Sequence, residues 1–168
     1  MISSELRAIQ HPIKERYKAD PASAMRTFHA RAVLGENLTA RLDSAGHERV
    51  VGPHEAAGGS GKELCSGDML LESLVACAAV TLSSVATVME IAFSHAEIRA
   101  EGDADFRGTL GVERSVPVGI TNIRLIYDLT TDAPDDKVAK LVQLTERYCI
   151  VYQTLAAPPK VEITVSRG

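Results

Sequence analysis

The stretch from Cys65 to Leu82, "CSGDMLLESLVACAAVTL", is the most apolar part of the chain and decides how its fold is interpreted. It contains two of the three cysteines and two acids. Apolar side chains recur at spacings of three and four, which predicts an amphipathic helix over 68–91 that starts near Ser66 or Asp68. The predicted apolar face consists of Leu70, Leu74, Cys77, Thr81, Val85 and Val88.

This helix is long enough to raise the question of a membrane span. A spanning helix needs about 20 predominantly apolar residues. Here Glu72 lies inside the stretch, and serines and threonines gather on one side of it. We therefore predict the core helix of a globular domain and no association with a membrane.

Segments on both sides of this helix alternate between apolar and polar residues, as strands do. Three strands are predicted before it, and two strands, a second helix and a last strand after it. Because the strands come in runs, the order βββ-α-ββ-α-β predicts an α+β fold with a mostly antiparallel sheet. The predicted strands are 26–33, 38–43, 48–51, 96–106, 120–129 and 160–167, and the second helix lies within 130–148.

A length of 168 residues favours one domain with a hydrophobic core. We expect residues 25–168 to form this domain. Residues 1–24, which end in the turn-forming "ADPAS", are expected to be a mobile or loosely docked arm. This N-terminal segment is charged throughout and has no apolar signal-peptide core, which predicts a cytoplasmic protein.

The composition argues against a nucleic-acid partner. The formal net charge is −4, aromatic residues are 4%, and tryptophan is absent, so neither a basic stripe nor a stacking platform is expected. The Gly-rich loop 52–68 fails the phosphate-loop pattern, because Ala56 replaces the first glycine and Glu63 replaces the final Ser or Thr. His54 and Cys65 fit no zinc pattern and are too few, so no metal site is predicted.

Three cysteines are too few for a disulfide scaffold, so each is a small buried hydrophobe or a reactive thiol. Cys77 lies in the middle of the first helix, and Cys149 lies where the second helix ends and a short element over 149–159 begins. If they meet, a peroxide would oxidise one to a sulfenic acid, and the other would condense with it to a disulfide. Alternatively, both are ordinary core residues, and spacing alone does not decide between the two.

Two separated motifs, each with a cysteine in register, resemble the signatures of the OsmC/Ohr family. "SGDMLLESLVAC" (66–77) is similar to the family's helix with a mid-helix cysteine. "CIVYQTL" (149–155), followed by "VEITV" (161–165), is similar to the second signature. The element order over 26–166 matches the family as well.

The resemblance implies an intertwined homodimer with an antiparallel sheet and two central Cys-bearing helices. It implies thiol-based reduction of organic hydroperoxides, with hydrogen peroxide as a further substrate, an external dithiol as reductant and no cofactor. By position, Cys77 is similar to the peroxidatic cysteine and Cys149 to the resolving cysteine. Asp68 falls where the family has an acid that holds an activating arginine.

The chain departs from the family pattern at that arginine. The loop after the first predicted strand is "LGEN" (34–37) and contains none, so Arg31 and Arg41 are the nearest substitutes and Arg31 is our candidate. Without a nearby cation, the pKa of the Cys77 thiol would stay at roughly 8.5 or above. Two other functions therefore remain open: a non-enzymatic dimer that binds a small apolar ligand, and an assembly protein with no pocket.

Overall fold

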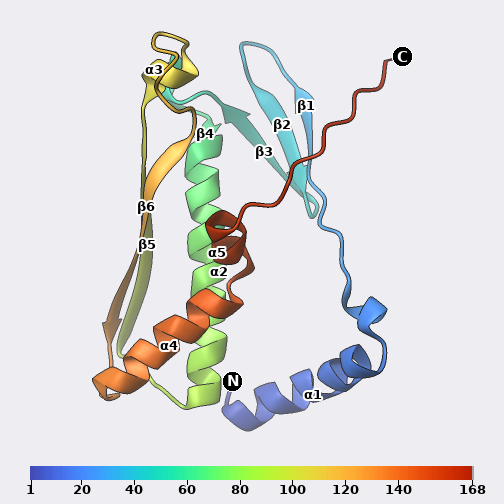
Figure 1. Cartoon of the computed structure of the whole chain (residues 1–168), viewed down its shortest axis with the longest axis vertical. Helices are drawn as coiled ribbons and strands as arrows, with labels where there is room; N and C mark the ends of the chain where they lie inside the picture. Colours follow the sequence, from blue (N-terminus) through green and yellow to red (C-terminus); the bar gives the residue numbers. More distant parts are fainter. Residues whose placement is uncertain (168) are drawn as a thin grey trace.

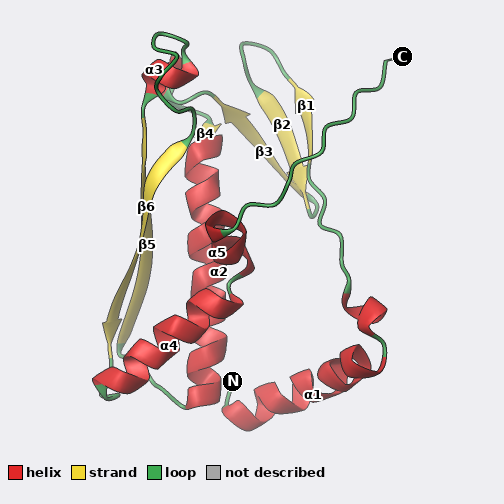
Figure 2. Cartoon of the chain, viewed as in Figure 1, coloured by secondary structure: helices red, strands yellow, loops and turns green. Residues whose placement is uncertain are grey.

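The structure is a computed structural model that describes residues 1–167 (Figures 1 and 2). It is a mixture of helices and strands, as an α+β fold requires. The α-helices are α1 (Ser3–Ala19), α2 (Ser66–Met89), α3 (Phe106–Thr109), α4 (Asp135–Tyr148) and α5 (Ile150–Ala156), and the 3₁₀ turns are η1 (Pro21–Ala24) and η2 (Glu55–Ala57). The strands are β1 (Arg31–Leu34), β2 (Ala40–Ser44), β3 (His47–Gly52), β4 (Leu64–Cys65), β5 (His95–Ala104) and β6 (Ile120–Thr130).

The strands form two sheets in which antiparallel pairing dominates. The first has the order β1-β2-β3-β4, with antiparallel pairing except between β3 and the short β4. The second is the long antiparallel ribbon β5-β6. The predicted meander and the predicted pair of strands after the first helix are both confirmed.

Helix α2 lies at the centre of the molecule, between the β5-β6 ribbon and the helices α4 and α5 (Figure 1). The core cluster joins α2 to the loop that follows it and to α4, through Leu82, Ala86, Ile91 and Leu141. Partly buried side chains of the ribbon, among them Ile98, pack against this cluster. The ribbon and α4 therefore fix the position of α2.

The buried side of α2 differs from the predicted one. The fully buried stripe is Leu74, Ala78, Leu82 and Ala86, at a spacing of four. Within the predicted face, Cys77 is half-buried, whereas Leu70 and Val88 are 38% and 41% exposed. The reason is that α2 is apolar around most of its circumference, so its periodicity does not determine which side faces the core.

By length and composition α2 is apolar enough to cross a membrane, with a mean hydropathy of 1.8 over its best window. The core helix of a globular domain passes the same test, and the packing of α2 against β5, α4 and α5 agrees with that role. The absence of a membrane partner stays a prediction.

The secondary structure at both ends of the chain differs from the prediction. The N-terminal arm, which we expect to be mobile or loosely docked, contains the 17-residue helix α1, which has no buried residue and was not predicted. The strand predicted over 160–167 is not formed within the described chain. Residues 157–167 run extended and exposed beyond α5, because no strand of the same chain lies beside them to pair with (Figure 1).

Candidate thiol active site

The junction between α4 and α5 places Cys149 against the middle of α2. Cys149 has an extended backbone, with φ −75° and ψ 106°. It is both the C-cap residue of α4 and the N-cap residue of α5. Its N–H donates to the carbonyl of Thr145, its carbonyl accepts from Gln153, and its Sγ accepts from the Tyr152 N–H at 3.4 Å. A single non-helical residue thus turns the chain and fixes its own thiol.

The two thiols lie within hydrogen-bonding range of each other. Cys149 is fully buried, and Cys77, reaching from α2, is half-buried. Hydrogen bonding between the two thiols lowers the pKa of Cys77 and raises the pKa of Cys149. The pairing that spacing left undecided is therefore present in the fold.

The environment lowers the pKa of Cys77. Burial alone would raise this pKa, but four donors outweigh it: the backbone N–H of Val151, the Cys149 thiol, the Thr81 hydroxyl and the backbone N–H of Ile150. Donors that point at a thiolate favour the charged form. None of the four is a cation, so the expected arginine is replaced by uncharged donors at the start of α5 and on α2.

The pKa of Cys149 is raised. Burial is the largest cause, and the negative charge and hydrogen bonding of Cys77 act in the same direction, whereas the backbone N–H groups of Tyr152 and Val151 oppose it. As the pH rises, Cys77 therefore loses its proton before Cys149 does. Coupled groups of this kind titrate as a pair, with the thiolate mainly on Cys77.

A hollow of about 500 Å³ lies between α2, β6 and α5, and it is lined by residues close in sequence to the two cysteines, Leu74 before Cys77 and Tyr152 after Cys149. Its walls are mainly apolar and include Leu74, Ile123 and Leu155, while Tyr152 borders it next to Cys149. Tyr127 of β6 has a buried hydroxyl with no hydrogen-bond partner among residues 1–167. Burial, and then the negative charges of Glu146 and Cys149, raises its pKa to about 12, so this hydroxyl keeps its proton.

The two charged candidates do not reach the thiols. Arg31 is exposed at the start of β1, opposite Asp43, and Asp68 is exposed in the first turn of α2. Within residues 1–167, no ion pair joins Arg31 and Asp68, and neither is among the groups that shift the pKa of Cys77. The structure therefore brings together Cys77 and Cys149 and leaves Arg31 and Asp68 outside.

The arginine that does approach α2 is Arg49 of β3, whose Nη1 lies 3.6 Å from Oε2 of Glu72. Both side chains are about half exposed, and ion pairs of this kind contribute little to stability. Glu72 is five residues before Cys77, which places it about 140° away around the helix. This pair therefore ties β3 to α2 without acting on the thiol.

The third cysteine lies far from the pair. Cys65 ends β4 and caps α2, twelve residues before Cys77. With a helical rise of about 1.5 Å per residue, the two backbones are about 18 Å apart. This distance excludes Cys65 as a thiol that resolves Cys77 directly in this conformation. Cys65 can therefore serve as a control cysteine in experiments on the pair.

Comparison with known proteins was made with the sequence and with the structure. A family model described as OsmC-like protein matches residues 59–164, well over half of the chain. The chain belongs to the OsmC-like family. This match contains both cysteines of the pair and confirms the family resemblance seen in the two motifs. No match was found among curated proteins.

Solved OsmC-like structures have the same fold. An OsmC-like protein from Mycoplasma pneumoniae is 18% identical, with a TM-score of 0.66 over 79% of this chain and 89% of that one. An organic hydroperoxide resistance protein from Elizabethkingia anophelis is 14% identical, with a TM-score of 0.64 over 80% and 91%. An OsmC-like protein of unknown function from Vibrio cholerae is 9% identical, with a TM-score of 0.64 over 77% and 94%. At these identities the likeness establishes the fold.

Sequence patterns missed the groups that lower the pKa of Cys77. Thr81 had a visible signal, because it follows Cys77 by one helical turn, but it was counted only as part of an apolar face. The N–H groups of Ile150 and Val151 have no signal, since every residue except proline has one. Only the break between α4 and α5 makes them available.

The pH dependence of alkylation tests this electrostatic description. Because the thiolate is the reactive form, a lowered pKa means that Cys77 reacts with iodoacetamide at lower pH than Cys149. Cys149→Ala, which removes a donor, should raise the pH midpoint of Cys77 alkylation, and Cys149→Ser, which keeps a donor, should raise it less. Peptide mass spectrometry across pH 6–10 measures both. Equal midpoints for the two cysteines, or no response to Cys149→Ala, would contradict the description.

Proposed function

We propose that this protein is a thiol-dependent peroxidase that reduces organic hydroperoxides, with hydrogen peroxide as a further substrate. The observation that carries the proposal is the contact between Cys77, whose pKa is lowered, and Cys149, whose pKa is raised. A peroxidatic thiol needs a stabilised thiolate and a second thiol within reach. The Elizabethkingia protein of similar fold is an organic hydroperoxide resistance protein, which is in line with this chemistry.

The first step is attack of the Cys77 thiolate on one peroxide oxygen. The O–O bond breaks, the sulfur becomes a sulfenic acid, and the alcohol leaves as an alkoxide that takes up a proton. Sulfur is oxidised by two electrons and the peroxide is reduced by two. The donors from Val151, Ile150 and Thr81 hold the thiolate that begins the step.

The second step joins the two sulfurs. Cys149 attacks the sulfenic sulfur, its proton leaves with the hydroxyl as water, and a Cys77–Cys149 disulfide forms. An external dithiol then exchanges with this disulfide and restores both thiols. The proposed cycle moves electrons through sulfur alone and includes no cofactor. We place it in the cytoplasm, where the three free cysteines of the chain would stay reduced.

The hollow beside the pair supports an apolar substrate. Leu74, Ile123 and Leu155 offer hydrocarbon surface close to Tyr152, which borders Cys149. The same hollow also favours the alternative function, binding of a small apolar ligand with no chemistry. The two functions differ in what they require of Cys77.

Substitution of each cysteine separates these functions. Cys77→Ser should lower the consumption of cumene hydroperoxide with a dithiol donor at least a hundredfold, because the hydroxyl does not form the nucleophilic anion near neutral pH. Cys149→Ser should give one turnover and leave a sulfenic acid that dimedone traps. Cys65→Ser is the matched control and should keep wild-type activity. A wild-type protein that consumes no peroxide would favour the binding function instead, and a Cys77→Ser variant with wild-type activity would exclude Cys77 as the attacking thiol.

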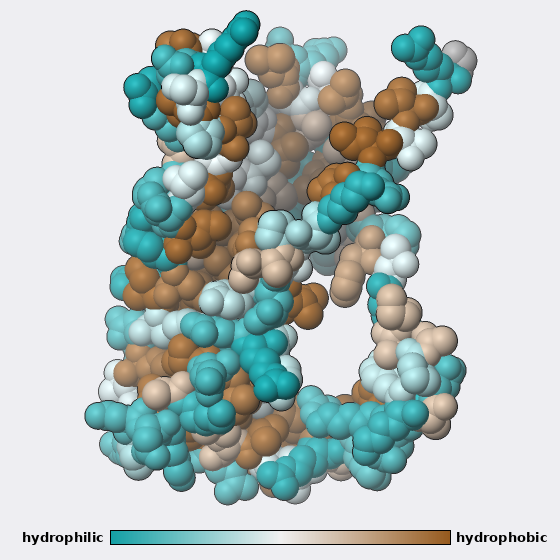
Figure 3. All heavy atoms as spheres, viewed as in Figure 1, coloured by the Kyte–Doolittle hydropathy of each residue, from teal (hydrophilic) through white to brown (hydrophobic). Residues whose placement is uncertain are grey.

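We also propose that two chains form an intertwined homodimer. Several large apolar side chains are exposed in the single chain, which is unfavourable for a protein in water. The C-terminal segment alternates, with Val161, Ile163 and Val165 between polar residues, and lacks a strand partner in its own chain. Figure 3 shows hydrophobic residues uncovered along this segment. A second copy would supply the missing partner strand and cover these side chains.

Light scattering after gel filtration tests the dimer. The chain mass is 18.0 kDa, so we expect a particle of about twice that mass. Ile163→Asp should shift the protein toward the monomer, because it places a charge on the apolar side of the segment. Thr164→Asp introduces the same charge on the opposite side and should leave the dimer intact. A wild-type monomer, or equal effects of the two variants, would exclude this interface.

A further inference from the structure

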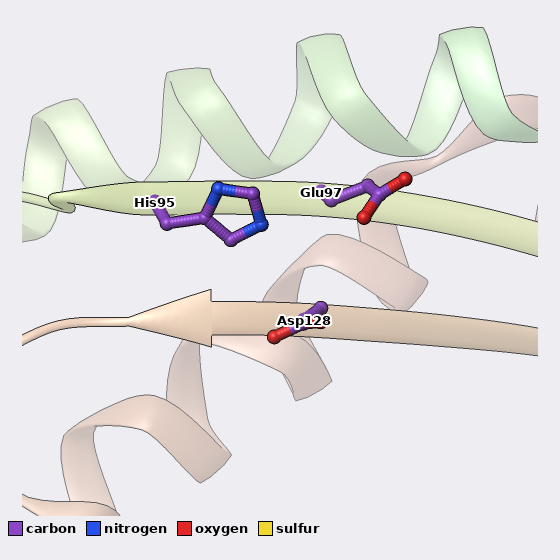
Figure 4. A group of neighbouring side chains, drawn as sticks. All are labelled: His95, Glu97 and Asp128. Carbon is purple, nitrogen blue, oxygen red and sulfur yellow. The ribbon is translucent and has the colours of Figure 1, made fainter.

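We propose that the β5-β6 ribbon binds one divalent transition-metal ion of the zinc class through His95, Glu97 and Asp128. One possible ligand atom from each of these side chains lies within 4.8 Å of the other two. Figure 4 shows His95 and Glu97 on β5 beside Asp128 on the neighbouring strand β6. The three side chains are exposed, so an ion can reach them from solvent.

The register explains why these groups converge. Glu97 is directly opposite Asp128 in the antiparallel pairing, and His95 precedes Glu97 by two residues, which places it on the same face. Like charges directly opposite each other destabilise a pair of strands. A bound cation would turn this repulsion into a cross-strand link.

Elsewhere on the same ribbon, the chain supplies its own cation. Arg124 of β6 lies 3.0 Å from Glu101 and 2.8 Å from Asp103, both on β5. Arg99 is the next residue on the face of His95 and Glu97, but within residues 1–167 it forms no ion pair with Glu97 or Asp128. The acids opposite each other near His95 are therefore left without a protein cation.

The donor set selects the class of metal. One imidazole nitrogen with two carboxylates suits zinc and similar transition ions, whereas calcium and magnesium prefer oxygen alone. Ligand atoms about 2.1 Å from a tetrahedral zinc are about 3.4 Å apart, so these side chains need to close by about 1.4 Å at most. Exposed side chains make such a movement by rotation. Three protein ligands leave the fourth position to water.

This site is separate from the thiol pair. Ala96 and Ile98, on the other face of β5, line a hollow against α2, so the ribbon lies between the proposed metal and the helix that carries Cys77. The inference therefore does not depend on the peroxidase proposal. Its effect would be on the ribbon itself, because the ion joins β5 to β6 where the ribbon begins.

Calorimetric titration with zinc chloride tests the proposal in the full-length protein. Because thiolates also bind zinc, the informative quantity is the difference between variants. Wild type should bind one zinc ion per chain more than His95→Ala, and Asp128→Asn should weaken this site at least tenfold. Glu101→Gln, which removes an acid already paired with Arg124, is the matched control and should bind as wild type does. Equal zinc stoichiometry and affinity in wild type and His95→Ala would overturn the site.

Thermal unfolding gives a second readout that a thiol site would not reproduce. Glu97→Gln removes the like-charge pair, so its metal-free Tm should be higher than that of wild type. Zinc should raise the Tm of wild type and of the Cys77→Ser variant, and it should raise the Tm of Cys77→Ser more than that of a Cys77→Ser/Glu97→Gln double variant. An equal rise in Cys77→Ser and the double variant, or no rise in Cys77→Ser, would contradict the proposal.

Discussion

The contact between the middle of α2 and the junction of α4 and α5 is the constraint on which the candidate site depends. Cys149 interrupts the helix for one residue, and this break turns the N–H groups of Ile150 and Val151 toward Cys77. If α4 continued as a regular helix, those N–H groups would be bonded to carbonyls one turn earlier. One extended residue thus supplies both the second thiol and the donors that stabilise the first as a thiolate.

The packing of α4 against the core fixes the position of Cys149. Leu141 and Thr145, two turns and one turn before Cys149, are fully buried, and the Thr145 hydroxyl donates to the carbonyl of Leu141 at 2.9 Å. The end of α4 is therefore held against the core with its polar group satisfied. Because donors fixed in advance need no rearrangement when charge develops, they favour a thiolate even where burial acts against it.

Much of the fold could be predicted from the sequence, because local patterns are strong in this chain. The helix around Cys77, the meander before it and the end of the second helix at Cys149 follow from periodicity and turn residues. The failures have physical causes. Helix α1 has no buried face, so the sequence contains no apolar stripe that would predict it. Residues 160–167 alternate like a strand, but a strand needs a neighbour, and residues 1–159 do not supply one.

The two cysteines of the site could be predicted from the sequence, but the groups that shift their pKa values could not. Cys77 and Cys149 are recognisable by type and position, whereas backbone donors are invisible in a sequence and their direction depends on the break at Cys149. A search for charged residues therefore led to Arg31 and Asp68, which lie away from the thiols. The His95 group was missed for a related reason, because its members meet only through the register of β5 and β6.

The most direct test of the central claim is the count of free thiols in the folded protein before and after one equivalent of cumene hydroperoxide, with the disulfide located by peptide mass spectrometry. We expect three free thiols before the treatment and one after it, with Cys77 joined to Cys149 and Cys65 unchanged. Three free thiols after treatment, or a disulfide that includes Cys65, would contradict it.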